Sequence, residues 1–181
     1  MKKQLSKYYV VLILLILFTA PGVTAYLFYT HPSWLGSTRI NKGVLLPKPV
    51  ALTSIEGKAK WRLLLWTPGT CEQECLQQLD ILARVRLALG RKLYQVEQKL
   101  VLGEEQSEQL ATIKQELDDK DIQISTLSEL DKQQLQQLSS KPKIFIMNPD
   151  NYLVLSYKSG VKPNDVYKDL KVLLSATEIK G

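Results

Sequence analysis

Two cysteines, Cys71 and Cys75, are the residues of this sequence whose type and spacing best suit chemistry. Residues four positions apart share one face of a helix, and their Cα atoms lie roughly 6 Å apart, which is within the range that a disulfide allows. The pair can therefore be oxidised together or share one metal ion. Alternatively, the two cysteines are inert, buried small side chains or form a purely structural bridge.

The position of the pair in the sequence favours a chemical role. The turn-forming residues Thr67-Pro68-Gly69-Thr70 directly precede Cys71, so we expect a helix to open on the cysteines. A thiolate at the start of a helix is stabilised by the helix dipole and by free N–H groups, which lower its pKa. We predict that Cys71 is the nucleophile, and that Cys75, one turn deeper and more buried, resolves mixed disulfides. No general base is identifiable.

A predicted strand and a predicted helix flank the pair. The stretch from Lys60 to Trp66 is short, apolar and aromatic, which is typical of a buried strand. Trp66 is expected in the core, where it would shield the cysteines. From Cys71 to Leu89 apolar residues recur at helical spacings, and Gly90 supplies a stop, so we expect a helix packed on a sheet.

The rest of the sequence predicts an α/β domain with a central mixed sheet flanked by helices. Its clearest local structure is a hairpin, because turn formers at 148–151 separate two apolar runs. A Ser-x-x-Asp pattern also predicts a capped helix start at Ser128. The further predicted strands are 93–102, 122–124, 143–147 and 152–157, and the further predicted helices are 104–117, 128–138 and 161–175.

An uncharged stretch of 22 residues, 8–29, is long enough to cross a bilayer as a helix. Lys2, Lys3 and Lys7 precede it, and the positive-inside rule keeps such a basic tail in the cytoplasm. We therefore predict a single-pass protein of the inner (cytoplasmic) membrane with its C-terminal domain on the periplasmic side. The competing interpretation is a signal peptide that is cleaved near 23–25.

The remaining length leaves room for one domain. The formal charge is +6, from 24 basic and 18 acidic residues, and three of the basic ones precede the apolar stretch. Such a small, scattered excess argues against binding of nucleic acid, which needs a clustered basic surface. We predict a cytoplasmic tail at 1–7, a transmembrane helix at 8–29, an extended surface linker at 30–49 and a domain at 50–181.

These features resemble the thioredoxin-like superfamily over roughly 44–175. The resemblance rests on the apolar strand that ends in WTPGTCEQEC and on the late hairpin IFIMNPDNYLVLSY before a terminal helix. Three residues between the cysteines, rather than two, resemble the Sco/SenC branch of that superfamily. Members of this branch are membrane-anchored assembly factors of cytochrome c oxidase that bind copper through two cysteines and a distant histidine. The resemblance therefore implies a thioredoxin-like domain and a role in oxidase assembly.

The sequence departs from the Sco pattern at the third copper ligand. Counting back from Pro149 in the hairpin turn, the position that matches the histidine is about Ser140. The single histidine, His31, stands beside the membrane segment, where we expect it at the lipid interface. Met147 offers copper(I) a soft sulfur but is more simply a core residue. Pro142 resembles the proline that thioredoxins place, in cis, opposite their cysteines, so the departure favours thiol chemistry over a stable copper site.

We therefore expect a membrane-anchored Sco-like factor in respiratory oxidase assembly. It would act by thiol-disulfide exchange or by transient copper(I) handling at Cys71 and Cys75. Its partners would be the membrane and either an oxidase subunit or another thiol protein. Two alternatives stay open: a non-catalytic thioredoxin-like binding module or scaffold, and a general periplasmic oxidoreductase.

Overall fold

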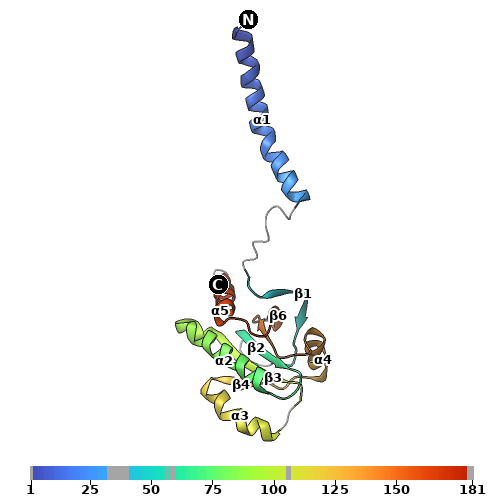
Figure 1. Ribbon diagram of the computed structural model, residues 1–181, viewed down its shortest axis with the longest axis vertical. Coiled ribbons are helices and arrows are strands. Elements are labelled where there is room, and N and C mark those ends of the chain that lie inside the picture. Colours follow the sequence, from blue (N-terminus) through green and yellow to red (C-terminus); the bar gives the residue numbers. More distant parts are fainter. Residues whose placement is uncertain (1, 32–40, 56, 58–59, 105–106, 179–181) are drawn as a thin grey trace. The chain divides into compact units, whose positions relative to one another are not determined.

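The computed structural model describes residues 2–31, 41–55, 57, 60–104 and 107–178 (Figure 1). The chain forms two compact units, Met1–Ile40 and Asn41–Gly181. The first unit contains one long helix, and the second is an α/β domain that carries both cysteines.

Helix α1 extends over Lys2–Thr30. Its part Tyr8–Thr30, 23 residues, is long and apolar enough to cross a membrane. Pro21 lies inside the helix, and the hydroxyl of Thr24 donates a hydrogen bond of 2.8 Å to the carbonyl of Ala20. The predicted apolar helix is confirmed, and its insertion into a membrane stays a prediction.

The domain is built on a six-stranded sheet of β1 Val44–Ala51, β2 Trp61–Thr67, β3 Val96–Leu102, β4 Ile122–Ile124, β5 Lys143–Met147 and β6 Tyr152–Tyr157. The strand order is β1-β6-β5-β2-β3-β4. Strand β2 pairs in parallel with β3 and antiparallel with β5. The sheet is therefore mixed, as predicted, and β2 lies inside it.

Helices cover both faces of the sheet (Figure 1). Side chains of α2 (Gln73–Ala88), α3 (Ser107–Asp119) and α5 (Pro163–Glu178) enter the core on one face, and those of α4 (Glu129–Leu138) enter the core on the other. Helices α2 and α5 contact each other. The cysteine-bearing helix is thus supported by a neighbouring helix as well as by the sheet.

Alternation along β2 assigns its side chains to two separate cores. Leu63 and Leu65 pack in the same core as Cys75, whereas Leu64 and Trp66 pack on the opposite face of the sheet. Trp66 donates its indole N–H to the carbonyl of Ser139 at 3.0 Å on that opposite face. Neighbouring residues of a strand point to opposite faces of the sheet, so Leu65 faces the core of Cys75 and Trp66 faces away from it. The prediction that Trp66 shields the cysteines is therefore wrong.

Strand β1 corrects the prediction that the extended surface linker continues to residue 49, because the strand begins at Val44. Val44 pairs with Ser156 and Val50 pairs with Leu153, and the register shifts between these two pairs. Two prolines of β1 fall at or beside this irregular stretch. Proline lacks the N–H that a ladder needs, but an edge strand tolerates it, and β1 is an edge strand.

The residues after α2 also differ from the prediction of a strand from 93 to 102. Gly90–Gln95 form a short 3₁₀ helix, η2, and β3 begins only at Val96. Gly90 has a φ of +55°, a left-handed conformation that ends α2 at little steric cost. In contrast, the predicted cap of α4 is confirmed, because the hydroxyl of Ser128 accepts from the backbone N–H of Asp131 at 3.3 Å.

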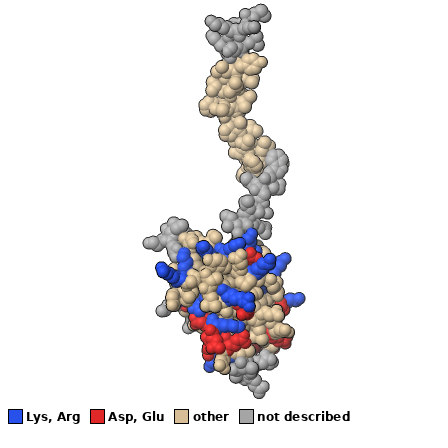
Figure 2. Space-filling model, turned by 60° about the vertical axis from the view of Figure 1, so that its left-hand side comes forward, with Lys and Arg blue, Asp and Glu red and all other residues tan. Residues whose placement is uncertain are grey.

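Charge is unevenly distributed along the domain. Seven of the 18 acidic residues of the chain lie between Glu104 and Asp121, where Lys114 and Lys120 supply the basic charge. In the view of Figure 2, acidic side chains gather in one region of the folded part, and basic side chains lie over much of the rest. A partner that approaches this face would meet both signs of charge.

Buried Asp169 of α5 fixes the start of the domain. Its carboxylate accepts hydrogen bonds from the backbone N–H groups of Lys42 at 2.8 Å and Gly43 at 2.7 Å. It also accepts from the hydroxyl of Tyr157 at 2.9 Å. A Cβ added to Gly43 would lie 2.7 Å from the Tyr157 ring, so glycine fits there without displacing the ring. The segment that leads into β1 is therefore bound to α5.

This cluster predicts a loss of stability at high pH. Burial, and next the charge of Asp169, raise the pKa of Tyr157 above its usual value. Above about pH 10 the unfolded chain loses a proton that the folded chain keeps, so stability falls by up to about 1.4 kcal/mol per pH unit. Urea unfolding of the full chain in detergent at pH 8 and pH 11 measures this fall. We expect a smaller fall in Tyr157→Phe but an unchanged one in Tyr94→Phe, whose side chain is 74% exposed.

Candidate functional site

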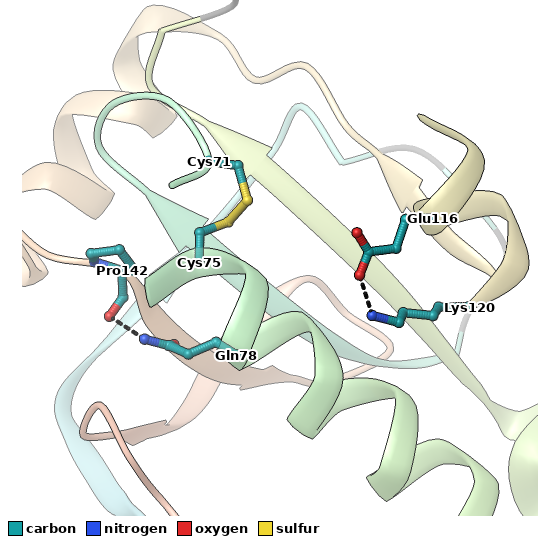
Figure 3. Close-up of a disulfide and its surroundings, with 6 residues drawn as sticks. All are labelled: Cys71, Cys75, Gln78, Glu116, Lys120 and Pro142. Carbon is teal, nitrogen blue, oxygen red and sulfur yellow. Dashed lines mark hydrogen bonds and ion pairs between the residues drawn. A yellow bond between two sulfur atoms is a disulfide. The ribbon is translucent and has the colours of Figure 1, made fainter. Parts of the chain in front are cut away.

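Cys71 and Cys75 form a disulfide at the start of α2 (Figure 3). Their Cα atoms are 5.1 Å apart. Cys71 is half-buried in the loop before the helix, whereas Cys75 lies inside the helix and is fully buried in the core. The predicted proximity of the two cysteines is confirmed. The bridge therefore has one sulfur-bearing residue at the surface and one in the interior.

A tight loop connects β2 to the disulfide. The backbone N–H of Gly103, just after β3, donates to the carbonyl of Thr67 at 2.8 Å and so ties the loop to the neighbouring strand end. Gly103 approaches so closely that an added Cβ would lie 2.0 Å from the carbonyl oxygen of Pro68. The position of the loop, and with it that of Cys71, therefore depends on the missing side chain of Gly103.

Helix α2 begins at Gln73, so Cys71 precedes its first turn and Cys75 is its third residue. The first helical hydrogen bond runs from the N–H of Leu76 to the carbonyl of Glu72 at 3.0 Å. The Glu72 side chain makes no capping hydrogen bond. N–H groups of the first turn have no partner inside a helix, and they favour negative charge near the helix start. This arrangement suits a thiolate at Cys71.

Gln78 connects α2 to the loop before β5. Its side chain is buried, and its amide N–H donates to the carbonyl of Pro142 at 3.1 Å, on the Cys75 side of the disulfide (Figure 3). A polar residue on the apolar face of the helix, three positions after Cys75, was the signal in the sequence for such a contact. The structure thus brings the carbonyl of Pro142 to the helix that carries the cysteines, at a residue three positions after Cys75.

The conformation of Pro142 corrects the resemblance in one respect. The peptide bond between Lys141 and Pro142 is trans, not cis. In this chain the loop before β5 reaches α2 through the carbonyl of Pro142 and the side chain of Gln78. Within the same loop, the backbone N–H of Lys141 donates a hydrogen bond of 3.3 Å to the hydroxyl of Ser139.

Charged groups near the site are engaged with protein partners. Glu116 of α3 and Lys120, which directly follows that helix, are drawn beside the disulfide in Figure 3 and form an ion pair with 2.5 Å between their charged atoms. Glu74, in the first turn of α2, accepts from the hydroxyl of Ser159 in the loop after β6. This second contact brings the loop after β6 to the cysteine-bearing end of α2.

The other candidate metal ligands do not join the cysteine pair. Met147 is buried on the opposite face of the sheet, with Trp66, and His31 belongs to the unit of α1. Ser140 is exposed in the turn after α4. Within the described part of the chain, no group of three or more His, Cys, Asp and Glu is placed to hold a metal ion. The site offers a copper ion two sulfurs, which does not complete the three-ligand set that the Sco resemblance implied.

Known proteins share both the sequence pattern and the fold of the domain. A family described as "Transmembrane-like, thioredoxin-like, C-terminal domain" matches residues 61–177. A comparison with curated proteins found no match. Among solved structures, apo Sco1 from Thermus thermophilus is similar with a TM-score of 0.53 and 18% identity, over 76% of this chain and 99% of that one.

Two further structures show the same fold. Yeast Sco1 has a TM-score of 0.53 and 14% identity, over 75% of this chain and 97% of that one. A DsbF homologue from Corynebacterium diphtheriae has a TM-score of 0.52 and 15% identity, over 76% of this chain and 95% of that one. These similarities confirm the predicted thioredoxin-like fold.

Proposed function

Because the chain belongs to the family of transmembrane-like, thioredoxin-like C-terminal domains, we propose that it is a membrane-tethered protein of thiol-disulfide exchange. The observation that carries this proposal is the bridge between a half-buried Cys71 and a fully buried Cys75 at the start of α2. A merely structural bridge needs neither the surface position of one cysteine nor an uncapped helix start beside it.

In the proposed reaction the thiolate of Cys71 attacks one sulfur of a partner disulfide. A mixed disulfide forms, and one partner thiolate leaves. The thiolate of Cys75 then attacks the sulfur of Cys71, which forms the Cys71–Cys75 bridge and releases the second partner thiolate. Two electrons pass to the partner, which is reduced while this protein is oxidised. A dithiol donor reverses both steps and restores the reduced pair.

The buried position of Cys75 suits the second step. Its sulfur is kept from external disulfides by the surrounding core but stays within bonding distance of Cys71. The side chain of Gln78 binds the loop before β5 to α2 and thus holds the surface around the cysteine pair in place. The partner therefore meets one reactive sulfur, not two.

The test is reduction of a peptide disulfide by the full chain in detergent. We expect the reduced wild-type chain to react at least about 100-fold faster than a variant with both Cys71→Ser and Cys75→Ser. Equal rates for the two proteins would instead support the alternative, a binding module in which the bridge has no chemical part.

We further propose that α1 anchors the domain in the inner membrane by a single pass, with the domain on the periplasmic side. The support is the length and apolar character of Tyr8–Thr30 and the three lysines that precede it. A reporter fused after Gly181 that is active only in the cytoplasm would contradict this orientation. A mature chain shortened by about 25 residues would support the cleaved signal peptide instead.

A second candidate function is Sco-like copper handling in respiratory oxidase assembly. It is favoured by the three-residue spacing between the cysteines and by the fold shared with Sco1 structures. The donor set argues against stable copper binding, because two sulfurs are present and Ser140 stands where the resemblance places a histidine.

Copper titration separates the two functions. We expect the purified reduced chain to show no strong thiolate charge-transfer band with copper(II), because the imidazole ligand is missing. We expect Ser140→His to strengthen binding, because it supplies an imidazole at the position where the resemblance places the histidine. The matched control is Gln136→His, which places an imidazole on the exposed side of α4 and should leave binding unchanged. A strong band in the unmodified chain would favour copper handling.

A further inference from the structure

A buried hydroxyl lies at the end of β2 from which the cysteine loop emerges. Thr67 is the last residue of this strand and is 1% exposed. Its backbone is fixed, because it pairs with Leu102 of β3 and its carbonyl accepts from the N–H of Gly103. Its hydroxyl, in contrast, makes no hydrogen bond to any described residue. Burial of an unpaired polar group is unfavourable, so this hydroxyl calls for an explanation.

The side chain of Thr67 faces the core that contains Cys75. Leu65 of β2 packs in that core, whereas Trp66 packs on the opposite face of the sheet. Side chains alternate along a strand, so Thr67 points to the same side as Leu65. Leu102, the partner of Thr67 on β3, also packs in the core of Cys75. Helix α2, with Cys75 in its first turn, packs against β2 on this side.

The other buried polar side chains on this side of the sheet are already engaged. The amide of Gln78 donates to the loop before β5, and the amide of Gln98 donates to a carbonyl of α2 at 2.7 Å. The carboxylate of Asp169 accepts from two backbone N–H groups and a tyrosine hydroxyl. The Oε1 atom of Gln98 has no partner among the described residues, but it can only accept. The hydroxyl of Thr67 is thus the available donor at the cysteine end of β2 within the described part of the chain.

Reduction of the disulfide creates an acceptor for this hydroxyl. Cys75 is fully buried, and a thiol in apolar surroundings resists the loss of its proton because burial disfavours the charged form. The second step of exchange nevertheless needs the thiolate of Cys75. A hydroxyl that donates to a thiolate stabilises the charged form. In the oxidised protein the bridged sulfur carries no charge and is a weak acceptor, in keeping with the unbonded hydroxyl.

We propose that Thr67 is a further catalytic residue, whose hydroxyl donates a hydrogen bond to the sulfur of Cys75 in the reduced protein and in the mixed disulfide. This inference rests on the proposed exchange function and adds a residue to its second step. In that step the thiol of Cys75 gives its proton to solvent, and its sulfur bonds to the sulfur of Cys71. The electron pair of the broken bond leaves with the partner thiolate. Thr67 keeps its own proton and stabilises the charge on Cys75.

The test measures the two steps of exchange separately in the full reduced chain in detergent. A peptide disulfide is added in large excess, so that the mixed disulfide accumulates before it is resolved. The reaction is quenched with acid at set times, and mass spectrometry counts the reduced, mixed-disulfide and oxidised forms. Thr67→Val removes the hydroxyl but keeps the shape of the side chain.

Thr67→Val should slow the second step and leave the first unchanged. Loss of one hydrogen bond to a charged group lowers the fraction of thiolate by roughly 10- to 100-fold. The greater nucleophilicity of the less acidic thiol offsets part of this loss. We therefore expect the second step to slow by about 3- to 10-fold.

Two control variants and a stability measurement complete the design. Thr67→Ser keeps a hydroxyl and should leave the second step within about 2-fold of the unmodified rate. Thr126→Val removes an exposed hydroxyl in the loop after β4 and should change neither step. Urea unfolding of the oxidised chains is the third readout. An apolar group of the same shape in place of an unpaired hydroxyl should not lower the stability of the oxidised protein.

An unchanged second step in Thr67→Val would overturn the inference, and so would an equal slowing in Thr67→Ser. Loss of stability in oxidised Thr67→Val, or slowing of both steps, would show that the hydroxyl serves the fold and would also overturn it. In these cases exchange by the unmodified chain stays intact. No reaction of the unmodified chain with the peptide would overturn the exchange function itself and this inference with it.

Discussion

Cys71 of the reduced protein is expected to be alkylated at neutral pH at least about 30-fold faster than Cys75. The reason is geometric, because Cys71 is half-buried in the loop before α2, whereas Cys75 has 0% exposure. The start of α2 also favours the thiolate form at Cys71. Mass spectrometry of the full chain after timed alkylation measures the two rates, and the urea-unfolded chain, where both should react alike, is the control.

The same asymmetry predicts which single variant captures a partner. Cys75→Ser leaves the outer thiol but removes the resolving one, so mixed disulfides should accumulate. Cys71→Ser leaves a buried thiol and should capture none. Faster labelling of Cys75 would reverse the two roles. If neither cysteine reacts until the chain unfolds, the bridge is structural and the binding-module alternative gains support.

The second large effect is expected from Gly103→Ala. An added Cβ would lie 2.0 Å from the carbonyl oxygen of Pro68, and the obstacle is backbone that a side-chain rotation cannot move. The loop before Cys71 must shift, and the hydrogen bond from Gly103 to Thr67 must lengthen or break. We expect the free energy of unfolding to fall by about 2 to 4 kcal/mol, as for strong overpacking.

Gly69→Ala is the matched control for this prediction. Gly69 lies in the same loop, but nothing is within 4 Å of its added Cβ. We expect it to change the free energy of unfolding by less than about 0.5 kcal/mol. Urea unfolding of both variants measures the difference, and alkylation of Cys71 shows whether the loop has moved. A stable Gly103→Ala variant with unchanged alkylation would mean that the close approach does not position the loop.

Local patterns in the sequence were enough to predict most elements of the domain. The aromatic strand before the cysteines, the late hairpin, the cap at Ser128 and the final helix begun by Pro163 all appear in the structure. Each depends on interactions between residues close in sequence, such as turn formation, capping and alternation of apolar residues. The approach of Cys71 to Cys75 is also local, but Cys71 precedes α2, so the disulfide joins the loop to the helix and does not join two residues within the helix.

Only the tertiary structure decided the features that depend on distant segments. Residues 44–51 became a strand because β6 offers an open edge, which outweighs the two prolines. The opposite faces of Trp66 and Cys75 follow from packing in two separate cores. Gln78 gained its role from a loop 64 positions away.

The sequence by itself determined that this protein has one long apolar helix, a thioredoxin-like domain and a cysteine pair at a helix start. The apolar helix and the cysteine pair follow from local periodicity and spacing, whereas the thioredoxin-like domain follows from the resemblance of the cysteine motif and the late hairpin to that superfamily. The sequence could not determine where the chain enters the sheet relative to Cys71, because that depends on the register of β1, β6, β5 and β2 together. Pairing between strands far apart in the sequence, such as Val44 with Ser156, decides it, and such pairing leaves no local pattern.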